Sequence, residues 1–110
     1  MAKHDFGIML DTPSNKRYDE YEPEEYQCIS IYDNYIEPLI REFYDIPCYW
    51  HTLCRPEKNL AYYGITLILP ESANLFVSVF SGHDDEYYKE LIDLFKQATR
   101  ENKYIIHFGI

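Results

Sequence analysis

Hydrophobic and polar residues alternate over several stretches of the chain, which is the pattern of strands with one buried face. Residues 26–32 give the plainest case, with Ile29 and Ile31 on one side and Cys28 and Ser30 on the other. Four further stretches alternate in the same way or are rich in Tyr, Ile, Thr and Leu, and they are predicted as strands: 4–10, 48–54, 60–69 and 104–110. The second and third of these are so close in sequence that an antiparallel hairpin is their simplest connection.

Apolar residues recur at helical spacing in three other stretches. In residues 36–43 they follow one stripe at i, i+3, i+4 and i+7: Ile36, Leu39, Ile40 and Phe43. Asp33 is a predicted N-terminal cap for this helix. Residues 70–80 and 84–100 are predicted as two more helices, and the latter has acids near its start, bases near its end and Asn102 as a C-terminal cap.

Apart from the first strand, and with 70–80 and 84–100 counted as one helical region split at Gly82, the predicted order is β-α-β-β-α-β. This order is typical of the α+β class and of a ferredoxin-like sandwich, in which both helices cover one face of an antiparallel sheet. The first strand would then extend a sheet edge or cross over it. We expect the helices to cover the side that bears these residues: Ile29, Ile31, Tyr63, Ile65, Leu67, Ile106 and Phe108.

The other face of the predicted sheet is mixed rather than charged, so we expect something to cover it. We predict that this face is covered by the acidic loop of residues 11–25 folded back, by a second subunit or by a partner. The residues that would form this ligand or interface face are Cys28, Ser30, Tyr62, Thr66 and His107.

Composition narrows the class of protein. The chain has 110 residues, which suits a single domain spanning 1–110, and its 46% hydrophobic and 26% charged residues are typical of a globular protein. The net charge of −9 argues against nucleic acid and anionic membranes as partners. There is no signal-peptide pattern or long apolar run, and the three cysteines are odd in number, so the sequence predicts a cytoplasmic protein with reduced thiols.

Residues 11–25 carry much of this charge, with six acids against two bases and several turn-forming residues. They are predicted as a long loop. One interpretation is a solvated loop whose tyrosines pack on the domain. The other is a docking segment in which aromatic rings anchor a basic partner and carboxylates steer it. Its candidate docking residues are Tyr18, Tyr21, Glu22, Glu24 and Glu25.

Residues with catalytic potential form no recognisable motif. Cys48 and Cys54 would lie about 20 Å apart on an extended strand, which is too far to share a zinc ion. His51 and His107 are possible bases or ligands, but the predicted strand order puts them on opposite edges. His4, near the terminus, could approach either. No metal or cofactor is therefore expected.

Three segments resemble those of short bacterial cytoplasmic proteins of similar length, a group with no assigned activity: CYWHT at 48–52, AYYGITLILPES at 61–72 and KYIIHFGI at 103–110. The resemblance implies a bacterial cytoplasmic setting and no particular chemistry.

Together, these observations predict a non-catalytic protein-binding or regulatory domain, a homodimer, that recognises a basic protein. An immunity protein that neutralises a basic nuclease is one concrete form. The alternative is a small enzyme or small-molecule binder that uses the mixed sheet face, with His107 and Tyr62 as its polar anchors.

Overall fold

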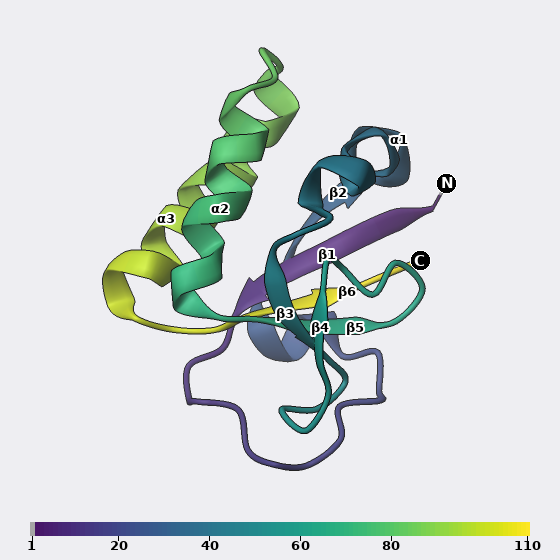
Figure 1. Cartoon of the computed structure of the whole chain (residues 1–110), viewed down its shortest axis with the longest axis vertical. Coiled ribbons are helices and arrows are strands. Elements are labelled where there is room, and N and C mark those ends of the chain that lie inside the picture. Colours follow the sequence, from purple (N-terminus) through teal and green to yellow (C-terminus); the bar gives the residue numbers. More distant parts are fainter. Residues whose placement is uncertain (1) are drawn as a thin grey trace.

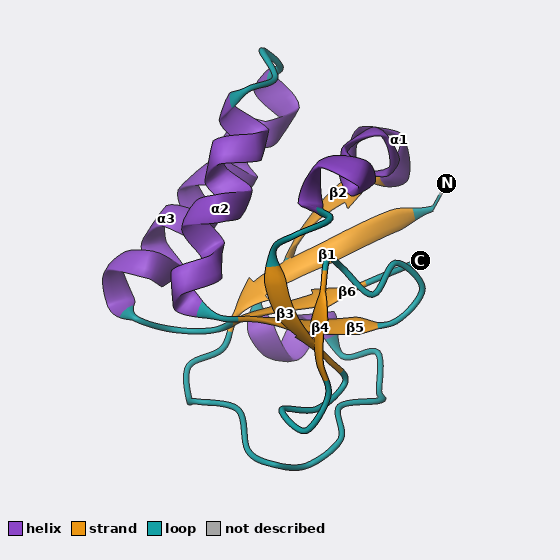
Figure 2. Ribbon diagram, viewed as in Figure 1, coloured by secondary structure: helices purple, strands orange, loops and turns teal. Residues whose placement is uncertain are grey.

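A six-stranded antiparallel sheet forms the centre of the molecule (Figures 1 and 2). The computed structural model describes residues 2–110. The strands lie in the order β2-β1-β6-β5-β3-β4. Their bounds are β1 Lys3–Ile8, β2 Ile29–Tyr32, β3 Pro47–Trp50, β4 Pro56–Lys58, β5 Ile65–Ile68 and β6 Ile105–Phe108.

Helices cover one face of this sheet. The long helices α2 (Pro70–Ser81) and α3 (Lys89–Glu101) pack side by side, as Figure 1 shows. The short helix α1 (Asp33–Ile36) and the 3-10 helix η2 (Glu37–Phe43) adjoin them over the same face. The short 3-10 helix η3 (Glu86–Tyr88) leads into α3, and one more 3-10 helix, η1 (Pro23–Tyr26), lies on the opposite side of the sheet. The predicted α+β class is confirmed.

The strand order differs from that of a simple ferredoxin-like sandwich, so this finer prediction is not confirmed. There, the first strand of the repeat would lie inside the sheet beside the last one. Here β2 lies at the edge, because β1 pairs with both β2 and β6 and separates them. The N-terminal strand, expected as an addition, is therefore a central element of the sheet.

Some predicted elements have different bounds or geometry. The stretch 36–43 is mostly 3-10 helix, and the chain divides there into α1 and η2, which puts Pro38 in the first turn of η2. The loop expected at 55–59 contains the edge strand β4. Asn102 does end α3, in the left-handed conformation (φ 55°), and its N–H bonds to the carbonyls of the last turn.

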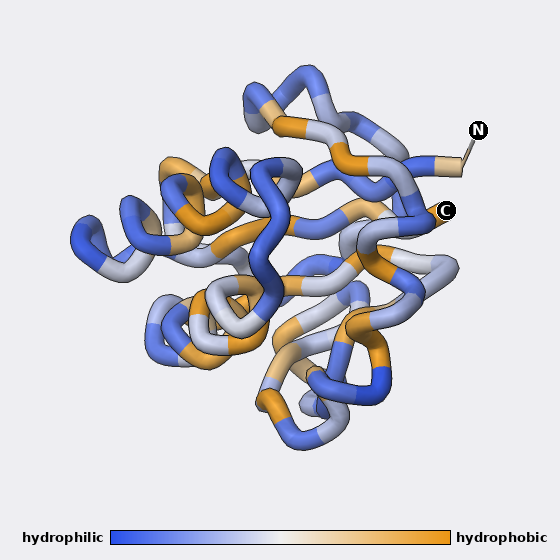
Figure 3. Tube along the Cα trace, turned by 90° about the horizontal axis from the view of Figure 1, so that it is seen from above, coloured by the Kyte–Doolittle hydropathy of each residue, from blue (hydrophilic) through white to orange (hydrophobic). Residues whose placement is uncertain are grey.

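The sheet is buried on both faces at β5 and β6, and this explains why the prediction of which residues of these strands face the helices was wrong. Every residue of β5 and β6 is buried, so their alternation carries no information about which side faces the helices. The helix side bears Thr66 and His107, while Leu67 and Phe108 face the other way. Figure 3 shows how hydrophobic and hydrophilic segments alternate along the helices that cover the first side.

Candidate functional site

Residues 11–28, here called the strap, cover the second face of the sheet. An apolar cluster lies on that face and consists of Met9, Ile65, Leu67, Ile106 and Phe108. Tyr18, Tyr26 and Cys28 from the strap pack against it. Of the three coverings considered for the second face, the structure therefore has the acidic loop folded back.

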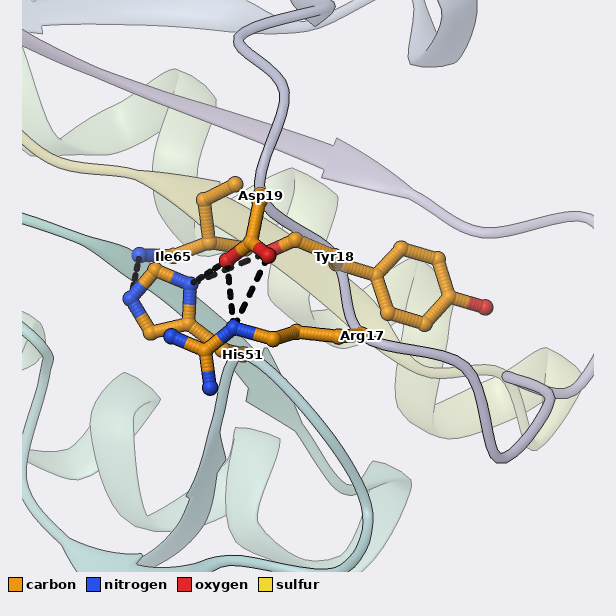
Figure 4. Close-up of polar contacts among 5 residues, drawn as sticks. All are labelled: Arg17, Tyr18, Asp19, His51 and Ile65. Atoms are coloured by element: carbon orange, nitrogen blue, oxygen red, sulfur yellow. Dashed lines mark hydrogen bonds and ion pairs between the residues drawn. The ribbon is translucent and has the colours of Figure 1, made fainter.

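His51 clamps the strap to the rest of the domain, as Figure 4 shows. Its backbone carbonyl accepts a bond from the Tyr18 N–H (2.6 Å), and its Nδ1–H donates to the Tyr18 carbonyl (2.9 Å). On the other side of the ring, Nε2 accepts from the Ile65 N–H at 3.5 Å. Asp19 lies 3.2 Å from His51 Nδ1 and also pairs with Arg17. These contacts give His51 a positioning role for the strap.

Tyr21 is attached to the sheet through Asp5, which is almost fully buried on β1. The Tyr21 hydroxyl donates to Asp5 Oδ2 (2.7 Å), and the Ser30 hydroxyl donates to Asp5 Oδ1. The hydrogen bond to Asp5 is the main reason that the pKa of Tyr21 rises to about 12. The ring nevertheless stays 60% exposed. The strap therefore presents the exposed Tyr21 ring in a position that is fixed by the hydrogen bond to Asp5 of β1.

Four glutamates of the strap lie at the surface and, unlike Asp19, which pairs with Arg17, take part in none of the ion pairs of residues 2–110. They are Glu20, Glu22, Glu24 and Glu25. The pKa of Glu22 is raised, first by a hydrogen bond with Glu20 and then by partial desolvation and the charges of Glu20 and Glu25. Crowded carboxylates of this kind favour a cation beside them.

A cavity of about 280 Å³ is lined by Glu20 and Glu22 among these acids. Ile106 and Phe108 of the sheet and Tyr18 and Tyr26 of the strap also line it. Lys16, Arg17 and Asp19 complete its lining. The strap thus combines surface charge with a hollow of side-chain size.

A second polar cluster is a buried chain of hydrogen bonds that crosses the sheet on its helix side. Thr66 Oγ1 lies 2.9 Å from His107 Nδ1, and His107 Nε2 lies 2.9 Å from His4 Nδ1. His4 Nε2 in turn lies 2.8 Å from Asp33 Oδ1, which also accepts from the Tyr62 hydroxyl (2.5 Å). His4 and His107 are both 0% exposed, and their rings are nearly parallel (17°) with centroids 5.1 Å apart, joined edge to edge by the hydrogen bond between them.

The hydrogen bonds of this cluster all run the same way, from Thr66 through His107 and His4 to Asp33. An ionised Asp33 only accepts, so with both histidines neutral the donors run from the Thr66 hydroxyl toward Asp33, and the Thr66 hydroxyl, whose oxygen accepts from the Ala61 N–H, donates to His107 Nδ1. His107 then donates from Nε2 to His4, and His4 donates from Nε2 to Asp33. This arrangement satisfies every ring nitrogen with both histidines neutral and Asp33 ionised.

The electrostatics of the cluster agree with that protonation state. Burial lowers the pKa of His107 well below its usual value, and the neighbouring His4 lowers it further. Burial also lowers the pKa of His4, although the carboxylate of Asp33 opposes this. Burial raises the pKa of Asp33, but the hydrogen bonds from Tyr62 and His4 outweigh it and leave that pKa low.

The residues predicted to share one open sheet face are divided between two buried layers. Thr66 and His107 lie on the helix side, Tyr62 reaches the same cluster from the turn before β5, and Cys28 and Ser30 lie on the strap side. The prediction of a shared open face is wrong. The reason is that the polar atoms of Thr66 and His107 form hydrogen bonds with one another, with the Ala61 N–H and with His4. These two residues can therefore be buried without losing the hydrogen bonds that water would otherwise provide.

Sequence reasoning missed the roles of Asp5 and Asp33. Asp33 was expected to cap a helix, yet Tyr32 occupies the cap position and Asp33 instead binds His4 and Tyr62. Asp5, an acid inside an apolar strand, was the available signal for a buried acceptor. His4 does approach His107, as its position near the terminus allowed.

Within residues 2–110, no helix is both long and apolar enough to span a membrane. The same residues contain no group of three or more His, Cys, Asp or Glu side chains arranged to hold a metal ion. Cys28, Cys48 and Cys54 are all free thiols.

Comparison of the chain with protein-family models, with curated proteins and with solved structures finds no match in any of the three. The resemblance to short bacterial proteins therefore stays a prediction, and the proposals that follow rest on the geometry of the strap, the sheet and the buried cluster.

Proposed function

We propose that this chain is a protein-binding domain that engages a basic partner through the strap. One observation carries the proposal: the strap holds exposed carboxylates and tyrosine rings in fixed positions on the sheet. Docking residues that are already ordered lose less conformational entropy on binding than those of a mobile loop.

The tyrosines supply the anchors in this proposal. Tyr18 is fixed through its backbone by His51, and Tyr21 through its hydroxyl by Asp5. Tyrosine contributes a large contact area with few rotatable bonds, and is enriched among the residues that dominate binding energy. The Tyr21 ring is 60% exposed beside the acids that would attract the partner, whereas the half-buried Tyr18 ring packs on the apolar cluster of the sheet, so Tyr21 is the main anchor.

The acids Glu22, Glu24 and Glu25 supply the steering. They stand close in sequence at the start of η1, and the raised pKa of Glu22 reflects the carboxylates around it. A lysine or arginine of the partner would relieve that repulsion, and the net charge of −9 would accelerate the encounter.

An inhibitor of a basic nuclease, as an immunity protein is, remains one concrete form of this function. Catalysis or small-molecule binding by His107 and Tyr62 is the alternative. We favour protein binding because the His107 side chain is fully buried and all its polar atoms are used within the domain. Homodimer formation is a separate expectation, which sedimentation equilibrium tests.

The test is affinity capture with the purified chain at low ionic strength, followed by kinetics with the captured protein. The variant Glu22→Gln/Glu24→Gln/Glu25→Gln should lower the association rate about tenfold and flatten its dependence on salt. A matched control removes the same number of charges elsewhere: Glu37→Gln, Glu71→Gln and Asp93→Asn. Equal association rates for the two triple variants, or capture of acidic proteins only, would overturn the proposal.

A further inference from the structure

The outer edge of β2 is an open sheet edge. β2 is the terminal strand of the sheet and pairs only with β1. Just beyond it, the Asp33 N–H bonds to the Ala2 carbonyl. Hydrogen-bonded and non-bonded pairs alternate in antiparallel sheets, so the bonded pairs along β2 include Ile31 and Ile29. Ser30 and Tyr32 therefore direct their backbone groups outward.

Three of those outward groups have no partner among residues 2–110: the N–H and C=O of Ser30 and the N–H of Tyr32. The Tyr32 carbonyl is instead at the cap position of α1, where it accepts the first helical bond. Both side chains are exposed, Tyr32 by 50%. The edge can therefore pair with a further extended segment.

The two edges of the sheet differ in sequence. At the other edge, β4 has a proline and two charged residues, Pro56, Glu57 and Lys58, which are typical devices against pairing with another chain. β2 reads Ile-Ser-Ile-Tyr and has none of them. The composition thus protects one edge and leaves the other available.

Two cavities lie along this edge, one beside β2 itself and one at the residues just before it, and η3 and helix α3 contribute to their lining. One, of about 410 Å³, is lined by Ser30, Ile31 and Tyr32 and, opposite them, by Glu86, Tyr87 and Glu90. The other, of about 370 Å³, has Gln27 on one side and Leu94, Gln97 and Glu101 on the other. The helical residues of both cavities follow a single stripe that begins in η3 and continues along α3.

This stripe joins two acidic regions that are far apart in sequence. Glu24 and Glu25 of the strap line the second cavity together with Glu101, and Glu86 and Glu90 line the first. The acids of the strap and of α3 therefore border the same sheet edge. Lys3 is the one basic residue lining the first cavity.

We propose that the β2 edge binds an extended basic segment of the partner as an additional strand, with Lys or Arg at alternate positions facing Glu86 and Glu90. The inference rests on the proposed function and adds that the basic partner binds through an extended strand. Glu86 in η3 and Glu90 in α3 are about 6–7 Å apart along the helix axis, at about 2.0 Å per residue in a 3-10 helix and about 1.5 Å in an α-helix, and residues i and i+2 of a strand are about 6.6 Å apart. Backbone bonds to Ser30 and Tyr32 would provide affinity, and the glutamates selectivity.

Charge selects this occupant over a second copy of the chain. A copy would bring a further net charge of −9 to an edge already bordered by five glutamates. A basic strand neutralises the same carboxylates, while Tyr32 and Tyr87 offer its apolar side chains two exposed rings.

The probe is a fluorescent peptide of alternating Lys and Val, with a backbone N-methylated peptide of the same sequence as its control. The unmodified peptide should bind at least about tenfold more tightly, because N-methylation removes strand pairing and keeps the charge. Equal binding of the two peptides would overturn the inference.

Tyr32→Pro tests the edge from the protein side. Tyr32 has a φ of −66°, which proline shares, and its N–H points outward, so the substitution removes one pairing donor without straining the strand. Tyr32→Ala is the control that loses the ring and keeps the donor. We expect Tyr32→Pro to weaken peptide binding about tenfold relative to Tyr32→Ala, and equal affinities would contradict the inference.

The acids are tested by Glu86→Gln/Glu90→Gln against Glu37→Gln/Glu71→Gln, which makes the same change in charge away from the edge. Only the first pair should weaken binding strongly. If a captured partner loses affinity with the strap variant but binds Tyr32→Pro normally, the edge inference fails while the proposed function stands. A wild-type dimer that Tyr32→Pro dissociates would replace the basic strand with a second copy.

Discussion

The buried pair His4 and His107 makes the stability of this fold sensitive to mild acid. Burial lowers the pKa of both side chains, so the native state keeps them neutral at pH values where the unfolded chain has already protonated them. Protons then bind preferentially to the unfolded state. The free energy of unfolding is therefore greatest above about pH 6.5, the usual histidine pKa, and falls as the pH drops below it.

The magnitude follows from linkage. One histidine that stays neutral in the native state removes about 1.4 kcal/mol of stability for each pH unit below its unfolded pKa. Between about pH 7.5 and about pH 5, His107 alone thus accounts for a loss of about 2 kcal/mol. Asp33 has a lowered pKa, and its own contribution is present above the unfolded value of about 3.9 and lost only below it. The two effects occupy separate pH ranges.

The assay is urea unfolding of the wild type and of His107→Gln across that range. Glutamine retains a donor for His4 and an acceptor for Thr66 but does not titrate, so the variant isolates the proton on residue 107. We expect the loss of stability from about pH 7.5 to about pH 5 to be about 2 kcal/mol smaller in the variant. Identical losses would refute the reasoning that His107 is neutral in the folded state.

Three further predictions follow from single contacts. Asn102→Gly should leave stability unchanged or raise it, while Asn102→Ala should lower it by about 1 kcal/mol in thermal unfolding, because the residue has φ 55°. His51→Ala should increase amide exchange at Tyr18 without unfolding the helices, and unchanged exchange there would show that His51 does not clamp the strap. In native protein Cys54 should react with a thiol reagent well before Cys48, whose burial raises the pKa to about 12, and equal rates would contradict the packing.

Local sequence signals predicted much of the fold correctly. The helices that contain Phe76 and Phe95 and the cap at Asn102 follow from periodicity and from a residue that tolerates the left-handed conformation. Strand order did not follow, because pairing is a long-range property. The N-terminal strand contains Gly7, a residue that is unfavourable inside strands but is needed here because Tyr26 and Cys28 approach the backbone closely.

The candidate site was predictable in part. The acidic residues and turn formers of 11–25 indicated the segment that forms the strap, and Tyr18 and Tyr21 do lie on a segment that packs against the sheet. The buried cluster was not predictable, because no periodicity connects His4, Asp33 and His107, which are separated by up to 103 residues. Its only sequence signal was the presence of polar residues within otherwise apolar strands, and such residues usually indicate a strand face that is exposed to solvent.

Amide hydrogen exchange of the chain, free and in complex with a captured basic partner, tests the central claim most directly. The partner should slow exchange across residues 18–32, which include the strap acids and the open edge of β2, and should leave helix α2 unchanged. Protection confined to α2 or η2, with the strap and β2 exchanging as in the free protein, would contradict the account.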